Sequence, residues 1–158
     1  TFRCFSRIYA NSQIMNIRYK LLNSEAVPPQ KMSSSSSGWD LSAALSEPLI
    51  LAPGARAAIP TGLALEIPPG YEGQIRPRSG LALKYGLGIL NSPGTIDADY
   101  RGEIKVILIN LSSEAITINP LMRIAQLVIC PVIDVCFEES EQLNESLRAD
   151  GGFGHTGY

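Results

Sequence analysis

Proline and glycine interrupt the middle of this chain at short intervals, so no regular element there can be long. Between them lie short runs rich in Ile, Leu and Val, which are typical of β-strands. In the nearly continuous apolar run 104–111 we expect both faces to be buried. We expect at most one helical turn, at 81–85. Strands at this spacing predict an all-β barrel or sandwich. The expected strands are 49–51, 57–67 with an interruption at 60–62, 71–76, 104–111, 116–118, 124–129 and 132–137.

The length and composition fit a single globular domain. The chain has 158 residues, of which 45% are hydrophobic and 18% charged. A net charge of -2 gives no cationic field that would hold nucleic acid non-specifically. No apolar run approaches the roughly 18 residues that a membrane span requires. We therefore expect neither a nucleic-acid nor a membrane partner.

The single histidine and the three cysteines exclude several kinds of site. His155 is the only histidine, so a metal cage of several histidines is impossible and a Ser-His-Asp or Cys-His system would have to use this residue. Cys4, Cys130 and Cys136 are odd in number and lack the spacing of a zinc site. We expect them to be reduced and to pack inside the protein, in a reducing compartment.

The two ends differ in composition from the middle. Residues 1–14 contain arginines but no acid, which fits an upstream extension of the reading frame, an organellar presequence or an ordinary flexible end. We expect an N-terminal extension at 1–15, a folded domain at 16–137, and a solvated acidic linker with a glycine-rich arm at 138–158. Such an arm is either disordered or ordered by a ligand or partner. Reduced cysteines and no recognisable signal peptide favour the cytoplasm over an organellar matrix.

Residues 77–82, Pro-Arg-Ser-Gly-Leu-Ala, follow an expected strand and carry groups suited to an anion. The guanidinium of Arg78 offers a planar fork of donors to a phosphate. Ser79 adds a hydroxyl, and Gly80 lets backbone N–H groups approach a ligand closely. A plain turn with a surface arginine would have the same sequence, so this segment alone leaves both interpretations open.

The segment 91–103 combines a turn with two carboxylates. Asn-Ser-Pro-Gly at 91–94 lies between two apolar runs and predicts a hairpin, whose tip could read the edge of a flat ligand with backbone groups. Asp97 and Asp99 would point the same way in a strand, and one of them could act as a general base on a water molecule. The alternative is a solvated turn with Tyr100 as an aromatic lid.

Polar residues also stand among apolar or glycine neighbours elsewhere. Asp40 lies between apolar neighbours and could equally cap a turn. Arg123 and Gln126 begin an apolar strand, where surface solvation is the simpler role. Phe153 stands among glycines with little core to pack against, so it is a candidate lid that stacks on a flat ring, with Arg148 on a terminal phosphate.

Taken in order, five blocks resemble the motifs of the homotrimeric dUTP diphosphatase (dUTPase) family over residues 16–158. The resemblance implies an all-β clip or jelly-roll-like barrel, a homotrimer with each site built from all three chains, and a C-terminal arm exchanged onto a neighbouring subunit. The implied reaction converts dUTP to dUMP and pyrophosphate, which keeps uracil out of DNA and supplies dUMP for dTMP synthesis. The blocks are 38–41, 77–82, 94–103, 123–127 and 148–157.

The resemblance also implies which residues contact the nucleoside. The segment 91–97 would recognise uracil by backbone contacts and leave no room for a 5-methyl group. Tyr100 would pack under the deoxyribose and exclude a 2′-hydroxyl. Asp97 would bond the 3′-hydroxyl and activate the water that attacks the α-phosphorus. The residues implied on this side are Asn91, Gly94, Thr95, Ile96, Asp97, Tyr100 and Lys105.

A second implied group contacts the phosphates. Mg²⁺ would sit on the triphosphate oxygens, and Asp40 would reach the ion only through water. Phe153 would stack on uracil and Arg148 would bind the γ-phosphate when the arm closes. The residues implied on this side are Arg78, Ser79, Gly80 and Gln126, and in the arm Arg148, Phe153, Gly154 and Thr156.

The chain departs from the family pattern in two places. Before Arg123 the family usually has a turn with Gly and an acid, whereas 120–122 here reads Pro-Leu-Met, which leaves the local turn and the partner of Arg123 open. In the arm, Ala149 and Asp150 stand where Gly and a variable residue are usual, and His155 where Ser is common. We expect a slightly stiffer arm and a peripheral His155.

Other functions compete with this interpretation. The dCTP deaminase family shares the fold, but it uses a glutamate whose place is taken here by Ile107. A non-catalytic nucleotide-binding regulator on the same scaffold would have lost the base or the arm, whereas Asp97, Tyr100, Arg148 and Phe153 are all present. A purely structural β-sandwich leaves the glycine-rich arm unexplained.

Overall fold

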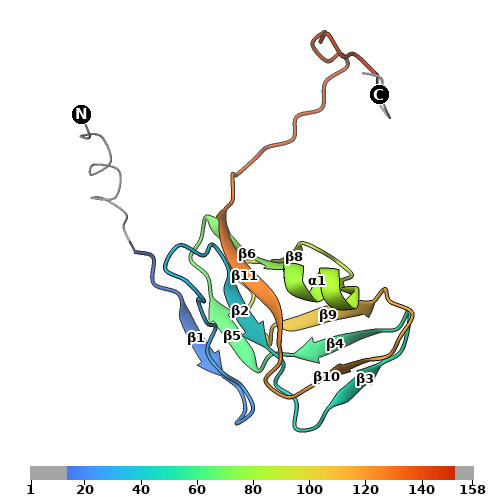
Figure 1. Ribbon diagram of the computed structural model, residues 1–158. Coiled ribbons are helices and arrows are strands. Elements are labelled where there is room, and N and C mark those ends of the chain that lie inside the picture. Colours follow the sequence, from blue (N-terminus) through green and yellow to red (C-terminus); the bar gives the residue numbers. More distant parts are fainter. Residues whose placement is uncertain (1–13, 152–158) are drawn as a thin grey trace, which may run out of the picture.

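The computed structural model describes residues 14–151, which are built almost entirely from short β-strands (Figure 1). This confirms the all-β prediction. One helix, α1 (Ser79–Tyr85), follows β6, and within the described residues no helix is long and apolar enough to cross a membrane. The strands are β1 (Arg18–Leu21), β2 (Trp39–Ser42), β3 (Leu49–Leu51), β4 (Arg56–Pro60), β5 (Leu63–Glu66), β6 (Tyr71–Arg76), β7 (Leu87–Ile89), β8 (Gly94–Ile96), β9 (Lys105–Asn110), β10 (Ile116–Ile118) and β11 (Arg123–Pro131).

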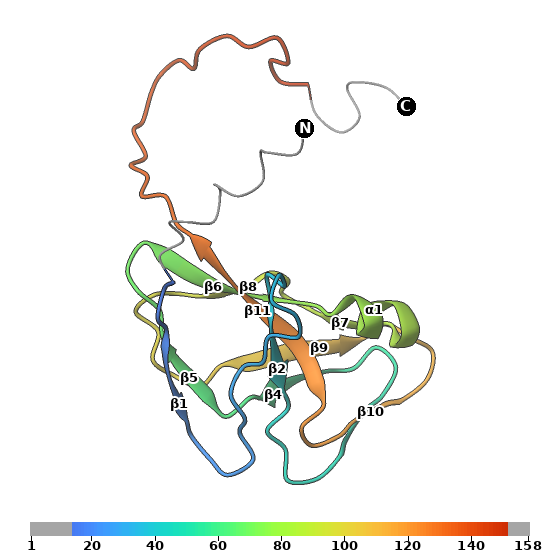
Figure 2. The same cartoon turned by 60° about the vertical axis from the view of Figure 1, so that its left-hand side comes forward.

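Antiparallel pairing organises the strands into two sheets and two ribbons. The larger sheet has the order β2-β11-β6-β8 and the smaller one β4-β9-β7, while β1-β5 and β10-β3 form the ribbons. Figure 2 shows β11 crossing the middle of the molecule, with the chain after it leading away from the strands. Each strand pairs mainly with a strand that is distant in sequence, so the fold depends on long-range contacts.

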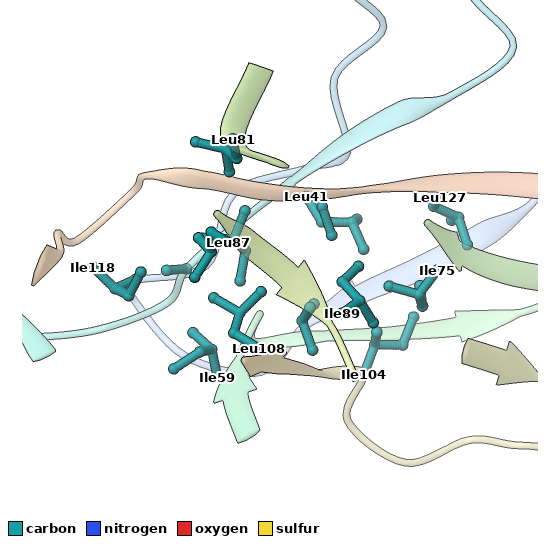
Figure 3. Close-up of a cluster of buried hydrophobic side chains, with 14 of the residues drawn as sticks. Leu41, Ile59, Ile75, Leu81, Leu87, Ile89, Ile104, Leu108, Ile118 and Leu127 are labelled. Atoms are coloured by element: carbon teal, nitrogen blue, oxygen red, sulfur yellow. The ribbon is translucent and has the colours of Figure 1, made fainter. Parts of the chain in front are cut away.

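One hydrophobic core lies between the two sheets. Figure 3 shows side chains of β2, β6 and β11 gathered in one cluster with those of β4, β7 and β9, with Leu127 beside Ile75 and Leu108 beside Ile59. Because each fully buried Leu or Ile contributes about 1.5–3 kcal/mol, this cluster supplies much of the stability. The members with less than 2% exposure include Leu41, Ile59, Leu63, Ile67, Ile104, Val106, Leu108, Ile118 and Ile124.

The predicted interruption at 60–62 separates β4 from β5 as a tight turn. Gly62 has a φ of 64°, a backbone conformation that glycine adopts without steric cost. The buried Thr61 donates its Oγ1 hydrogen to the Ile104 carbonyl at 2.6 Å, and the Thr61 backbone N–H donates to the same oxygen at 3.2 Å. The turn is therefore held against the residue that precedes β9.

The run 104–111 is buried on one face only, so the expectation of two buried faces was wrong for the single chain. Val106, Leu108 and Asn110 face the core, whereas Ile107 is only half-buried and Leu111 is 71% exposed. Asn110 is a fully buried polar residue whose amide donates to the Leu51 and Glu114 carbonyls at 2.9 and 2.7 Å. Its presence inside the core explains why the run does not read as uniformly apolar on that face.

The hairpin predicted at 91–94 is also wrong. The turn is present, but β7 before it pairs with β9, and β8 after it pairs with β6. The Leu90 backbone N–H donates to the Ile107 carbonyl at 3.0 Å, which keeps the first run on β9 up to the turn. The turn therefore carries the chain from one sheet to the other, a long-range choice that local sequence does not reveal.

The helix is longer than the single turn expected. Its seven residues include only one buried side chain, Leu81, so the sequence has little apolar periodicity to detect. Gly86 ends the helix with a φ of 62°, and its N–H donates to the Ala82 and Leu81 carbonyls.

The strand expected at 132–137 is absent, because β11 ends at Pro131 and the residues after it are exposed. The acidic segment 138–148 is exposed, as expected for a solvated linker. Cys130 and Cys136 are free thiols, but Cys136 is exposed, so the packing role expected for it was wrong. Cys4 lies outside the described residues.

Candidate active site

A cavity of about 450 Å³ opens where the chain leaves β8 and runs toward β9. It brings together residues that the sequence placed on the nucleoside side of the expected site, among them Asp97 and Tyr100. Asp97 is exposed and its carboxylate is open to solvent. The lining residues are Ala58, Thr95, Ile96, Asp97, Tyr100, Glu103, Ile104, Lys105 and Ile107.

The loop that carries Asp97 is closed by hydrogen bonds of its own. The Tyr100 N–H donates to the Asp97 carbonyl at 3.1 Å, and Arg101 Nη1 donates to the carbonyls of Ala98 and Tyr100 at 2.6 and 2.9 Å. Strand β8 ends at Ile96, so Asp97 and Asp99 lie in a turn, and the strand geometry considered for the pair does not apply. A carboxylate held on a closed loop at a cavity is positioned to act on a bound ligand.

Tyr100 rests on the backbone that follows it. Its hydroxyl donates to the Glu103 carbonyl at 2.9 Å, and its ring lies over Gly102. A Cβ at Gly102 would lie 2.5 Å from the phenol oxygen and 2.7 Å from Cζ, closer than real Cβ contacts come. The absence of a side chain at 102 is therefore what lets the ring lie there.

Asn91 and Gly94 lie together at the turn that leads into β8. Gly94 is buried, and a Cβ there would lie 3.1 Å from Asn91 Nδ2 and 3.4 Å from the Ile75 Cβ atom. Neither residue lines the cavity itself, but β8 carries the chain from Gly94 directly to Thr95 and Ile96 in its wall.

The second predicted group forms a separate cluster around Asp40. Asp40 Oδ2 lies 3.0 Å from Arg123 Nη1 and 3.3 Å from Arg78 Nη2, and Arg78 Nη1 donates to the Arg123 carbonyl at 2.8 Å. The Asp40 side chain is only 11% exposed. The partner of Arg123, which the sequence left open, is therefore Asp40. The turn before Arg123 has Leu121 at a φ of 60°.

Gln126 and the start of α1 complete this cluster. Gln126 Nε2 donates to the Pro77 carbonyl at 3.0 Å, directly before Arg78. A Cβ at Gly38 would overlap the Gln126 amide, so the glycine is needed for this packing. Ser79 and Gly80 are exposed at the first turn of α1, and a Cβ at Gly80 would meet open space.

The cavity and the Asp40 cluster lie at different corners of the larger sheet. The register pairs Gln126 with both Asp40 and Arg76, whereas Ile96 pairs with Gly73 further along β6. Three strand spacings across and four residues along place Asp97 about 20 Å from Asp40. Neither Arg78 nor Gln126 contributes to the cavity. One chain alone therefore does not bring the two predicted groups together.

The arm residues are separate from both groups. Arg148 is exposed, and its Nε donates to the Gly151 carbonyl at 2.7 Å within the segment that leads away from the strands (Figure 1). Phe153, Gly154, Thr156 and His155 lie outside the described residues. Within residues 14–151 no group of three or more His, Cys, Asp or Glu side chains could hold a metal ion by itself.

Sequence reasoning missed part of the cavity wall. Ala58 and Ile107 face each other across β4 and β9 and form an apolar wall, which depends on strand register and has no local signal. Glu103 lies inside the block 94–103, but the sequence predicts no role for it. Its proximity to Tyr100 in sequence was the signal that could have drawn attention to it.

The chain resembles known proteins along most of its length. A family model described as dUTPase matches residues 24–157. A deoxyuridine 5′-triphosphate nucleotidohydrolase of Bdellovibrio bacteriovorus is 57% identical over 138 residues, covering 87% of this chain and 93% of that protein. The corresponding enzyme of Chlamydia pneumoniae is 56% identical over 137 residues, covering 86% and 94%.

Solved structures give the same result for the fold. A variant of the Staphylococcus bacteriophage 80alpha dUTPase with dUpNHpp has a TM-score of 0.82 at 29% identity and covers 90% of this chain and 99% of that one. A variant of the dUTPase from S. aureus phage phi11, which coordinates a structural Mg(II) ion, has a TM-score of 0.76 at 26% identity, with 83% and 100% coverage.

An all-β fold of this topology, with an open carboxylate at one cavity and a separate cluster of arginines, fits the class of nucleotide hydrolases that the relatives represent. The chain belongs to the dUTPase family. Its reaction is the hydrolysis of dUTP, and neither deamination of dCTP nor a purely regulatory role is favoured. The half-buried Ile107 offers no carboxylate where a deaminase would require one.

Proposed function

We propose that this dUTPase works as a homotrimer in which the cavity of one subunit faces the Asp40 cluster of another. The separation of about 20 Å between Asp97 and Asp40 in one chain is the observation that carries this proposal. The base and the γ-phosphate of one nucleoside triphosphate lie closer together than Asp97 and Asp40 do in one chain. Bringing the two groups from different subunits to one substrate solves this mismatch.

The exposed faces of the chain support such an assembly. Ile107 and Ile109 of β9 are only partly covered, and Leu111 beyond them is exposed. Beyond β11, Ile133, Val135 and Phe137 alternate with polar or smaller residues and are 83%, 71% and 96% exposed. Apolar surface of this kind is stabilised by contact with other subunits. We propose that residues 138–158 then reach a neighbour's site as an exchanged arm.

In the proposed site the cavity holds the nucleoside. Backbone groups of 94–96 contact uracil, and Tyr100 packs under the deoxyribose, where it leaves no room for a 2′-hydroxyl. The exposed Asp97 carboxylate accepts a proton from the water that attacks the α-phosphorus. The closed loop around Asp97 keeps the carboxylate in place, so little reorganisation is needed when substrate binds.

The Asp40 cluster of the neighbouring subunit holds the phosphates. Arg78 is pre-oriented by Asp40 and by the Arg123 carbonyl, which leaves the start of α1 with Ser79 and Gly80 open toward an anion. A lone carboxylate with one oxygen between two arginines fits an ion carried mainly by the substrate, since Mg²⁺ usually keeps waters and phosphate oxygens as ligands. When bound, Mg²⁺ would neutralise charge on the triphosphate, with Asp40 reaching its waters.

In the arm, Arg148 would bind the γ-phosphate and Phe153 would stack on uracil, with Gly154 and Thr156 beside them. Closure of a segment over the site excludes water from the phosphates.

The test is pyrophosphate release by the purified protein with Mg²⁺ and each of dUTP, dTTP, dCTP and UTP, alongside the molar mass of the protein in solution. Release from dUTP alone and a trimeric mass are the expected results. Equal release from UTP would contradict the assignment of Tyr100. A stable, fully active monomer would contradict the shared site.

A further inference from the structure

Glu103 lies in the cavity wall and takes no part in the proposed reaction, yet its carboxylate is held on both sides. Its Oε1 accepts a hydrogen bond from the Gly62 backbone N–H at 3.0 Å. Its Oε2 lies 3.7 Å from Lys105 Nζ. The Glu103 side chain is 24% exposed and that of Lys105 is 55% exposed. Because exposed ion pairs contribute little, the bond to Gly62 is the stronger of the two connections.

The turn that holds this carboxylate is well anchored. Thr61 is buried and donates twice to the Ile104 carbonyl, while the Ile104 N–H donates to the Leu63 carbonyl at 2.8 Å. Ile104 itself is 1% exposed. Gly62 is therefore a fixed point, and the Glu103 side chain connects the cavity wall to it.

The backbone of the same residue supports Tyr100. The Tyr100 hydroxyl donates to the Glu103 carbonyl, and the ring lies on Gly102 with no space for a Cβ. Tyr100 is otherwise 44% exposed, so the 102–103 backbone is its main support among the described contacts. The position of the Glu103 carbonyl therefore helps to set the position of the tyrosine hydroxyl.

We propose that Glu103 is a positioning residue for sugar discrimination. Its carboxylate, bonded to Gly62, sets the place of the backbone on which Tyr100 rests, and so sets how closely the ring approaches the 2′ position of the sugar. This inference rests on the proposed role of Tyr100. It assigns selectivity between deoxyribonucleotide and ribonucleotide to a residue that does not touch the substrate.

The experiment compares kcat/KM for dUTP and for UTP in the wild type, Glu103→Ala, Glu103→Gln and Tyr100→Ala. Glu103→Ala removes the bond to Gly62 and lowers the dUTP-to-UTP ratio about tenfold, the effect of one lost hydrogen bond. Glu103→Gln keeps an oxygen that accepts from Gly62 and loses only the charge toward Lys105, so its ratio stays within about twofold of the wild type. Glu47→Ala, a change at an exposed glutamate elsewhere, is the matched control with an unchanged ratio.

A general loss of stability would lower both activities together and leave the ratio unchanged, so the ratio separates positioning from folding. Glu103→Asp, too short to reach Gly62, gives a second variant whose ratio falls with that of alanine. An unchanged ratio in Glu103→Ala, with a lowered ratio in Tyr100→Ala, overturns the inference and leaves the proposed function intact. An unchanged ratio in Tyr100→Ala overturns the proposed role of Tyr100. If the dUTP-to-UTP ratio falls as far in Glu103→Gln as in Glu103→Ala, the effect belongs to the charge toward Lys105 and the inference is overturned.

Discussion

Asp40 joins two arginines that lie 45 positions apart in the chain, and this contact identifies the partner of Arg123. The sequence around 120–122 left the partner of Arg123 open, because the usual glycine turn is replaced by Pro-Leu-Met. The chain makes a turn at this place with Leu121 at a φ of 60°. The turn before Arg123 therefore holds a leucine in a backbone conformation that favours glycine.

That strain is measurable by comparing two variants of Leu121. A residue with a Cβ in the left-handed region is disfavoured by about 1–2 kcal/mol. Leu121→Gly should raise the free energy of unfolding by up to about 1 kcal/mol relative to Leu121→Ala, after the extra chain entropy of glycine is deducted. Leu121 is 54% exposed, so both variants lose the same small contact area. Equal denaturation midpoints for the two variants would show that the turn is unstrained.

Asp97 gives the second prediction at this scale. Asp97→Asn should lower kcat about 10²–10⁴-fold, the usual contribution of a general base, while the affinity for a non-hydrolysable dUTP analogue is kept. Asp99→Asn is the matched control, since Asp99 is exposed, two positions away and outside the cavity lining. Single-turnover kinetics and calorimetric titration measure the two quantities. Full activity in Asp97→Asn would remove this carboxylate from the mechanism.

At the level of elements, the sequence predicted strands where local pattern decides and failed where pairing decides. Proline and glycine placed the turn between β4 and β5 correctly, because the left-handed backbone conformation at Gly62 favours glycine over other residues. The sequence predicts the turn at 91–94 correctly but the pairing of its flanking strands wrongly, since nothing local distinguishes a hairpin from a crossing between sheets. Residues 132–137 alternate like a strand, but no strand among residues 14–151 pairs with them.

The candidate site was likewise predicted where it depends on local sequence and missed where it depends on strand pairing. The residues of the cavity loop lie close together in sequence, so the motif predicted most of the wall, including Asp97 and Tyr100. Ala58 and Ile107 join it only through the register of β4 and β9, and Glu103 through a contact with a distant turn. Such contacts depend on the completed fold and cannot be read from spacing.

The arm is the element whose removal tests closure of the site. A chain ending at residue 147 should keep its fold and its oligomeric mass, because the described part of the removed segment, 148–151, contributes no core side chain. Its kcat/KM for dUTP should fall at least about tenfold, since closure excludes water and adds phosphate contacts.

Glu141→Gln, an exposed change in the linker, is the control for the arm deletion and should keep full activity. Sedimentation and pyrophosphate release are the measurements. Dissociation of the shortened protein into monomers would instead assign the arm to assembly.

For the whole molecule, the two separated groups lead to a statistical prediction. Asp97→Asn and Arg78→Ala subunits are each inactive alone, but a shared site can draw its Asp97 from one and its Arg78 from the other. Random mixing of the two variants in equal amounts by co-refolding should then restore about a quarter of the wild-type activity. A site receives an intact Asp97 with probability one half, and independently an intact Arg78 with probability one half.

Each variant refolded alone is the control for the mixing experiment and should stay inactive. No recovery in a mixture that forms mixed trimers, measured by mass spectrometry of tagged subunits, would contradict sites shared between chains.

The bare apolar run after β11 also bears on how the protein is made. A newly synthesised subunit exposes Ile133, Val135 and Phe137 to water with strand-like alternation, and no strand of the described part of the chain covers them. Exposed segments of this kind template aggregation when chains meet before they are correctly assembled. Slow synthesis prolongs the time that each subunit spends as an unassembled monomer. Several ribosomes on one messenger RNA shorten that time. The yield of soluble protein should therefore depend on the local concentration of newly synthesised chains, and not only on the stability of the finished fold.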